Sequence, residues 1–90
     1  MTLAKFRLGR IMTTPHALEQ ISNDDILTAI GRHQAGDWGD CDPDDRQAND
    51  QALLDGSRLF SVYHSGKGVK FWIITEANRE YTTVLLPSDY

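Results

Sequence analysis

The chain has 90 residues with a net charge of −4, and 40% of its residues are hydrophobic and 24% charged. This composition is typical of an ordinary globular protein and argues against disorder, so we expect one domain over residues 1–90. A single cysteine, no secretion signal at the N-terminus and no apolar segment near the roughly 18 residues that a membrane span needs predict a cytoplasmic location. The short apolar runs argue against a membrane role, and the acidic balance disfavours direct binding to nucleic acid.

The acidic residues are concentrated in the middle of the chain. Nine of the 13 lie between Asn23 and Asp55, where Arg32 and Arg46 are the only cations, so residues 1–22, 23–55 and 56–90 carry +2, −7 and +1. An acidic block between mildly basic arms indicates a protein that presents a negative face to another macromolecule.

The N-terminal third predicts a strand followed by a short helix. Residues 4–12 alternate between apolar and basic side chains, which predicts a half-buried strand with a bulge at Gly9. Thr14 followed by Pro15 is typical of a helix start, and the helix should cover residues 15–22. Its buried face should be formed by Leu18 and Ile21.

Two further helices are predicted in the acidic segment. Asn23 should cap a helix over residues 24–34, and Asp42 should cap another over 43–55 that ends at Gly56. Acidic residues in both first turns suit the positive end of the helix dipole. The buried stripes should comprise Ile26, Leu27, Ile30 and His33 in one helix, and Ala48, Ala52 and Leu53 in the other.

From residue 58 onward the apolar period is two, which predicts strands at Arg58–His64, Val69–Thr75 and Tyr81–Leu86, joined by turns at 65–68 and 77–80. The predicted fold is therefore α+β, in the order β-α-α-α-β-β-β, with an antiparallel sheet and the helices packed on one face.

One predicted strand is apolar on both faces. Phe71, Trp72, Ile73 and Ile74 are consecutive, so neither side of this strand is suited to water. Helices on one face leave the other to the long loop, a second copy of the chain or a target protein. The exposed set should include Trp72 and Ile74, together with Tyr63.

The acidic segment does not match a metal site. Asp40, Asp42 and Asp44 alternate as in a calcium loop, but Asp45 stands where that loop needs glycine and Gln51 where it needs glutamate. The histidines and Cys41 have no ligand spacing, and no phosphate-binding or nucleophile motif is present, so we expect no metal, no cofactor and no catalytic residue.

Two stretches carry a family resemblance. Residues 32–54, which begin Arg-His-Gln-Ala-Gly-Asp-Trp-Gly-Asp, and residues 72–87, which begin Trp-Ile-Ile-Thr-Glu-Ala-Asn-Arg, resemble a family of small "plasmid-related" proteins carried by bacterial plasmids, phages and integrative elements. The resemblance spans most of the chain, and it names a genetic setting without a mechanism. By analogy it implies an inhibitor of host defence of the anti-CRISPR or anti-restriction type.

The leading hypothesis is a non-enzymatic inhibitor whose Asp-rich face docks on the basic, nucleic-acid-binding surface of a defence complex, with a tryptophan as apolar anchor. The predicted partner-binding residues are Asp37, Trp38, Asp40, Asp42, Asp44, Asp45, Asp50 and Trp72.

Other readings stay open. The acidic face can be only solubilising, and Trp38 can simply pin its loop to the core. One alternative function is a toxin-like small ribonuclease, for which the available set is His64, Lys67, Lys70, Arg79 and Tyr81. Another is a homodimeric accessory module that pairs through the sheet face.

Overall fold

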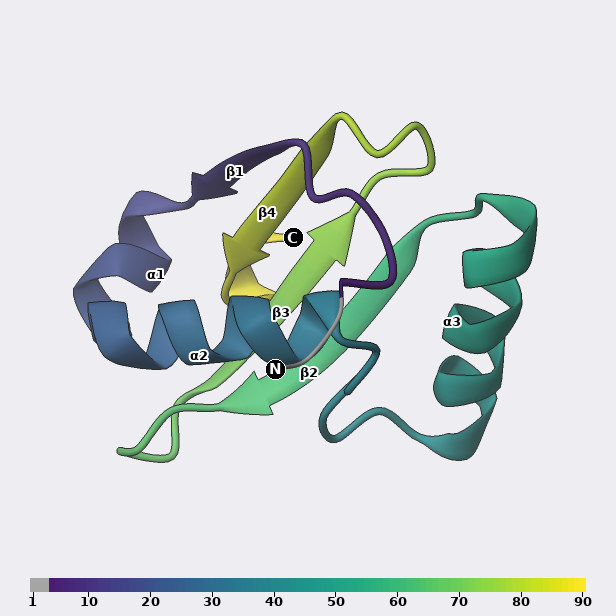
Figure 1. Ribbon diagram of the computed structural model, residues 1–90. Coiled ribbons are helices and arrows are strands. Elements are labelled where there is room, and N and C mark those ends of the chain that lie inside the picture. Colours follow the sequence, from purple (N-terminus) through teal and green to yellow (C-terminus); the bar gives the residue numbers. More distant parts are fainter. Residues whose placement is uncertain (1–3) are drawn as a thin grey trace.

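The computed structural model describes residues 4–90. Its elements in chain order are β1 (Arg10–Thr13), α1 (Pro15–Gln20), α2 (Asn23–Gln34), α3 (Pro43–Asp55), β2 (Leu59–His64), β3 (Lys70–Thr75), β4 (Tyr81–Leu85) and the short 3-10 helix η1 (Pro87–Asp89). The α+β class and the predicted order are confirmed (Figure 1).

The sheet has the strand order β1-β4-β3-β2, and its three C-terminal strands form the predicted antiparallel meander. β1, however, pairs in parallel with β4, with Arg10 opposite Tyr81, so the sheet is mixed and the prediction of an antiparallel sheet is corrected at this edge. A tight hairpin forces neighbouring strands to be antiparallel. No hairpin links β1 to β4, because all three helices and two strands lie between them in the chain.

The first strand is shorter than the predicted 4–12, since residues 4–9 are not part of the sheet. Gly9 is no bulge in a strand: it precedes β1 with φ +68°, against the backbone of Glu80. The ring of Phe6 lies edge-on to that of His33, with centroids 5.1 Å apart. The Phe6 side chain therefore packs on the C-terminal end of α2 instead of on one sheet face.

The predicted start of α1 and both predicted ends of α3 are confirmed by the capping contacts in the structure. The Thr14 hydroxyl accepts from the Ala17 amide, Asp42 caps α3, and Gly56 ends α3 in the left-handed conformation, all as predicted. The cap of α2 is Ser22 instead of the predicted Asn23, because its side chain accepts from the Asp25 amide.

Three residues were wrongly assigned to buried stripes. In α3, Ala48 is exposed, and the buried residues are Asn49 and Ala52. Leu18 is 55% exposed and Leu27 is 67% exposed. In α2 the buried line consists of Ile26, Ala29 and His33. Residue 27 lies about 100° around the helix from residue 26, and this rotation turns it to solvent.

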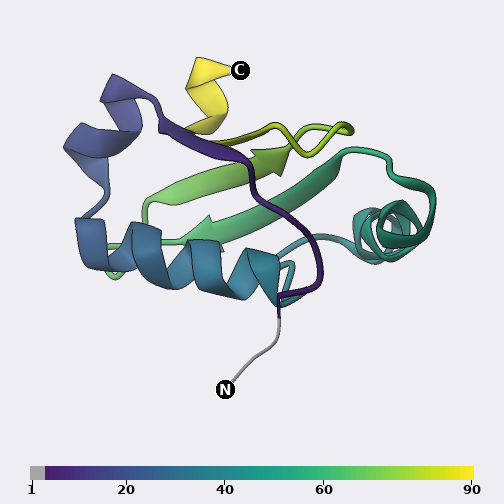
Figure 2. The same cartoon turned by 45° about the horizontal axis from the view of Figure 1, so that its top comes forward.

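The sheet separates two layers. Figures 1 and 2 show α1 and α2 on one side of the sheet and η1 on the other. The first core lies between these two helices and the sheet, and contains Ala17, Ile21, Ile26, Ala29, Tyr63, Phe71, Ile73, Val84 and Leu86. Tyr63 thus belongs to the helix side of the sheet, and its predicted place beside Trp72 was wrong.

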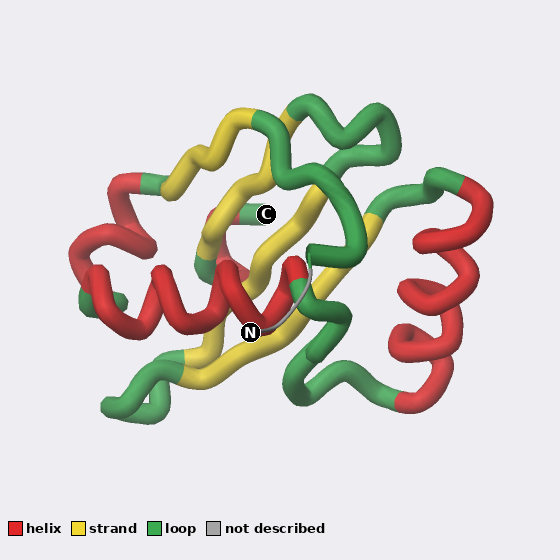
Figure 3. The backbone as a smooth tube through the Cα atoms, viewed as in Figure 1, coloured by secondary structure: helices red, strands yellow, loops and turns green. Residues whose placement is uncertain are grey.

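α3 lies beside the β2 edge of the sheet (Figure 1). The Asn49 side chain accepts from the Phe60 amide (2.9 Å) and donates to the Phe60 carbonyl (2.6 Å), as a neighbouring strand would. The loop between α2 and α3 adds Val62 N to Trp38 O (3.1 Å) and Asp40 N to Val62 O (2.8 Å); Figure 3 traces this loop in green. An unpaired strand edge invites aggregation, and here a helix side chain and a loop cover it.

No helix among residues 4–90 has the length and apolarity to cross a lipid bilayer.

Candidate partner-binding site

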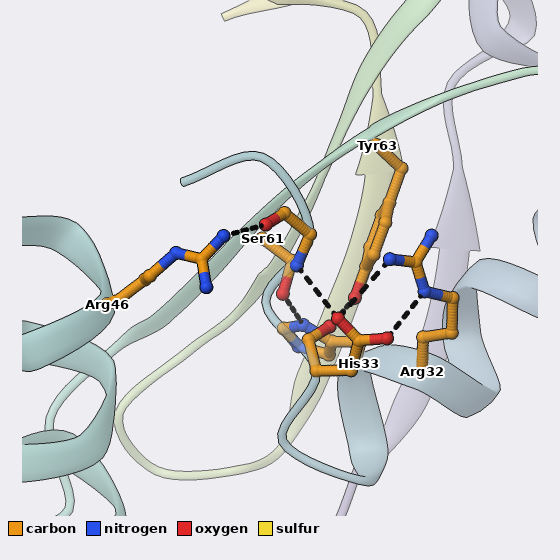
Figure 4. Close-up of polar contacts among 7 residues, drawn as sticks. Arg32, His33, Arg46, Ser61 and Tyr63 are labelled. Carbon is orange, nitrogen blue, oxygen red and sulfur yellow. Dashed lines mark hydrogen bonds and ion pairs between the residues drawn. The ribbon is translucent and has the colours of Figure 1, made fainter. Parts of the chain in front are cut away.

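The loop after α2 is held by the last turn of that helix. Arg32 donates to both carboxylate oxygens of Asp37, at 2.8 and 3.3 Å, and its guanidinium lies 4.8 Å from the ring centroid of Tyr63. The hydrogen bond from Arg32 lowers the pKa of Asp37 below its ordinary value. Tyr63 in turn donates to the Asp37 carbonyl at 2.6 Å, and these contacts are drawn in Figure 4. Asp37 therefore anchors its own loop.

Trp38 is not available as a surface anchor, because it is only 5% exposed. Its indole nitrogen donates to Asp50 at 3.0 Å, and its ring stacks near Phe6 with centroids 6.2 Å apart. The structure thus agrees with the reading in which Trp38 pins the loop to the core, and it also engages the carboxylate of Asp50.

Two more predicted site residues have local roles. Oδ2 of Asp40 lies 2.7 Å from Nδ1 of His64 at the surface. Asp42 accepts from the Asp45 amide at 2.8 Å as the cap of α3. Their carboxylates remain at the surface, but part of their hydrogen-bonding capacity is spent inside the molecule.

Asp44 and Asp45 are different. Both are exposed in the first turn of α3, and neither carboxylate forms an ion pair with any residue between 4 and 90. The positive end of the helix dipole stabilises them in their ionised form by roughly 0.3–1 kcal/mol each. In the stretch from Asp37 to Asp50 they are exposed carboxylates that can meet a cation from outside.

A cleft of about 340 Å³ lies between α3 and the second face of the sheet. It brings together two predicted site residues, Asp45 and Trp72, which are far apart in the chain. The remaining lining comes from Ala48, Asn49, Arg58, Phe60, Ile74 and Tyr90. We call this the α3 cleft.

Three aromatic rings form the apolar wall of the α3 cleft. Trp72 meets Phe60 edge to face at 5.1 Å and Tyr90 edge to face at 5.8 Å. Arg58 lies at the rim, where it donates to the Tyr90 hydroxyl at 3.0 Å and its guanidinium is 5.8 Å from the Tyr90 ring centroid. The Trp72 indole nitrogen is buried without a hydrogen-bond partner among the described residues. The predicted uncovered sheet face is therefore partly closed by α3 and Tyr90, with the α3 cleft opening between them. Ile74, predicted to be exposed there, is only 4% exposed, so that part of the prediction was wrong.

Sequence reasoning missed Asn49, Arg58, Phe60 and Tyr90 as part of this site. No local sequence pattern indicates them, because they come from four separate places: α3, the segment before β2, β2 itself and the residue after η1. The one available signal was the strand that is apolar on both faces, which indicated a covering element without identifying it.

The residues of the ribonuclease reading do not converge. His64 pairs with Lys70 at one end of β2 and β3, whereas Tyr81 lies beyond Thr75 at the other end of β3. Six strand residues separate these ends by roughly 16 Å. Arg79 donates instead to the carbonyls of Ser57, Glu76 and Ala52, at 2.7, 3.1 and 3.1 Å, so its guanidinium joins the turn before β4 to the end of α3.

Metal and nucleophile chemistry have no geometric support in the part of the chain that the structure describes. No group of three or more histidine, cysteine, aspartate or glutamate side chains among residues 4–90 could hold a metal ion. Burial raises the pKa of Cys41, whose thiol donates to the Phe60 carbonyl at 3.3 Å. Such a thiol is a poor nucleophile.

No family model, curated protein or solved structure matches this chain. The likeness to plasmid-related proteins accordingly stays a prediction from the two stretches that carry it.

Proposed function

We propose that this protein is a non-enzymatic inhibitor that binds a basic protein surface through the first turn of α3 and the α3 cleft beside it. The target class we propose is a nucleic-acid-binding complex of host defence, of the CRISPR or restriction type, acting in the cytoplasm. The observation that carries the proposal is the position of Asp45, an exposed carboxylate that lines an aromatic cleft and forms no ion pair with residues 4–90.

Charge and shape support this proposal together. An interface usually joins an apolar centre to a charged rim of complementary sign. The α3 cleft offers Phe60, Trp72 and Tyr90 as a centre, and its charged lining residues are Asp45 and Arg58. Asp44, beside Asp45 in the first turn of α3, adds a second exposed carboxylate next to the cleft. Partners that bind nucleic acid carry the clustered Lys and Arg side chains that such a rim attracts. The family resemblance to proteins of mobile elements is what points to defence complexes in particular.

The test begins with affinity capture of the tagged protein from a bacterial host, followed by binding measurements with the purified defence complex. The affinity should fall as salt rises, because the carboxylates lie at the surface. The double variant Asp44→Asn/Asp45→Asn should weaken binding at least about tenfold and restore the defence activity against phage or plasmid entry.

Asp24→Asn is the matched control. Asp24 occupies the same second helical position in α2 that Asp44 occupies in α3, and both are exposed, so Asp24→Asn matches the single change Asp44→Asn in its effect on the helix dipole. Binding that survives Asp44→Asn/Asp45→Asn unchanged, or that falls as much with Asp24→Asn, would show that net charge and not this site drives association.

A further inference from the structure

We infer that the α3 cleft is a receptor for an arginine side chain of the partner protein, with the aromatic rings facing the guanidinium and Asp45 accepting its hydrogen bonds. This inference rests on the proposed function and names the group that the acidic site recognises. It is testable without the partner.

The walls of the cleft favour a cation. The faces of aromatic rings carry negative partial charge and attract cations within about 6 Å of the ring centroid. Phe60 and Tyr90 each meet Trp72 nearly at right angles, at 73° and 72°, so the ring planes bordering the cleft are not all parallel. Rings that border one space in this way can face a single inserted group from more than one side.

A carboxylate completes the site. Asp45 lines the same cleft, and its side chain is not engaged by any cation among the residues described. Asn49 also lines the cleft, but its side-chain oxygen and nitrogen are both hydrogen-bonded to the backbone of Phe60. A cationic ligand would therefore bind Asp45 without breaking an existing contact of α3.

Arg58 shows which cation fits. Its guanidinium already lies 5.8 Å from the Tyr90 ring centroid at the rim. A guanidinium is planar, weakly hydrated and able to bond a carboxylate through two parallel donors, which an ammonium cannot do. The positive charge of Arg58 also repels a second guanidinium, and this repulsion lowers the affinity of the cleft for an arginine side chain.

The experiment uses the whole chain labelled with nitrogen-15 and follows the indole resonance of Trp72 during titration. The probes are acetyl-Gly-Arg-Gly-amide, its lysine, citrulline and glutamate counterparts, each up to about 10 mM, because a single side chain binds in the millimolar range. The arginine peptide should shift the Trp72 resonance and leave that of the buried Trp38 in place. The citrulline peptide, with the same shape and no charge, should bind about tenfold more weakly.

Matched variants locate the binding. Asp45→Asn should weaken the arginine peptide several-fold, whereas Asp44→Asn, one residue away and outside the cleft lining, should have little effect. Tyr90→Ala should weaken it, and Tyr81→Ala should not, although both tyrosines are exposed. Arg58→Gln should tighten it, because the opposing charge is removed while a hydrogen-bonding side chain remains.

Other outcomes overturn the inference. Equal binding of the arginine and citrulline peptides would show that the cleft does not recognise charge. Stronger binding of the lysine peptide than of the arginine peptide would show that the cleft does not select a guanidinium. Stronger binding of the glutamate peptide, weakened by Arg58→Gln, would show that the cleft binds anions. Absence of any shift up to about 10 mM would also refute it. If the arginine peptide fails but Asp44→Asn/Asp45→Asn still releases the defence complex, the proposed function stands and only the cleft receptor falls. The reverse pattern refutes the proposed function alone.

Discussion

The indole nitrogen of Trp38 donates a hydrogen bond to Oδ1 of Asp50 over 3.0 Å, and this bond ties the loop after α2 to the middle of α3. Asp50 therefore has a structural role in the fold, and its part in partner binding stays a prediction. We expect Asp50→Ala to lower the free energy of unfolding by about 1–2 kcal/mol, since a hydrogen bond to a charged acceptor is lost. Urea denaturation followed by tryptophan fluorescence measures this.

The Asp50 comparison has two controls. Asp50→Asn keeps an acceptor at the same place and should cost less than Asp50→Ala. Gln47→Ala changes an exposed side chain of the same helix and should leave stability within about 0.5 kcal/mol. Equal losses for Asp50→Ala and Gln47→Ala would mean that the bond to Trp38 contributes nothing.

The Asn49 side chain that covers the β2 edge should be intolerant of an isosteric change. In Asn49→Asp the acceptor for the Phe60 amide remains, but the donor to the Phe60 carbonyl is replaced by a carboxylate oxygen. Asn49 is only 2% exposed, so we expect a loss of about 3 kcal/mol or more at neutral pH. Thermal denaturation of this variant and of Gln47→Glu, which adds the same charge on the exposed side of α3, should separate edge pairing from helix charge.

Stability should decline between pH 6.5 and 4.5 because of His33. This residue is fully buried, its ring nitrogens contact Ser61 and Thr75, and Thr75 continues the polar chain to Thr82. Burial, with a smaller effect of Arg79, lowers the pKa of His33 from 6.5 to about 3. Below pH 6.5 the unfolded chain therefore binds a proton at His33 that the folded protein does not bind. The free energy of unfolding should fall by about 2 kcal/mol by pH 5.

The matched variant for this pH effect is His33→Gln, which retains polar atoms but does not titrate. Its stability at neutral pH should be lower, yet the part of the slope due to His33 should vanish between pH 6.5 and 4.5. Carboxylates with lowered pKa, such as those of Asp37 and Asp89, have an ordinary value of 3.8, so the stability they contribute is lost only at more acidic pH. An unchanged slope in His33→Gln would assign the effect to other groups.

Gly39 should be irreplaceable, and Gly68 supplies the control. Both have positive φ, +71° and +84°, so alanine at either position should cost about 1–2 kcal/mol in backbone strain. A Cβ at Gly39 would lie 1.9 Å from the Val62 carbonyl oxygen, whereas one at Gly68 would meet nothing within 4 Å. We expect Gly39→Ala to unfold the loop or the protein and Gly68→Ala to remain folded, as judged by circular dichroism and heteronuclear NMR. Similar stabilities of the two variants would show that the bridge between Gly39 and Val62 is dispensable.

The accuracy of sequence reasoning followed the range of the interactions involved. The ends of α3 were predicted correctly because Asp42 and Gly56 act on backbone groups within a few residues. The first strand was predicted to be too long because Phe6 packs against His33 and Trp38 instead of joining the sheet. The local alternation of side chains does not reveal such distant contacts. For the same reason Asp45 and Trp72 could each be named, but not their meeting in one cleft with Tyr90.

By itself the sequence determined the kinds and order of the three α-helices and four strands, the N-cap of α1 and both caps of α3, the meander of β2 to β4 and the acidity of the middle segment. Those properties depend on side-chain period, backbone preference and composition, all of which are local or additive. Only the tertiary structure decided that β1 runs parallel to β4, that α3 covers the β2 edge and that Asp44 and Asp45 stay free while Asp37 and Asp50 are engaged. These outcomes depend on which distant residues meet, and a carboxylate is available to a partner only when no internal donor reaches it first.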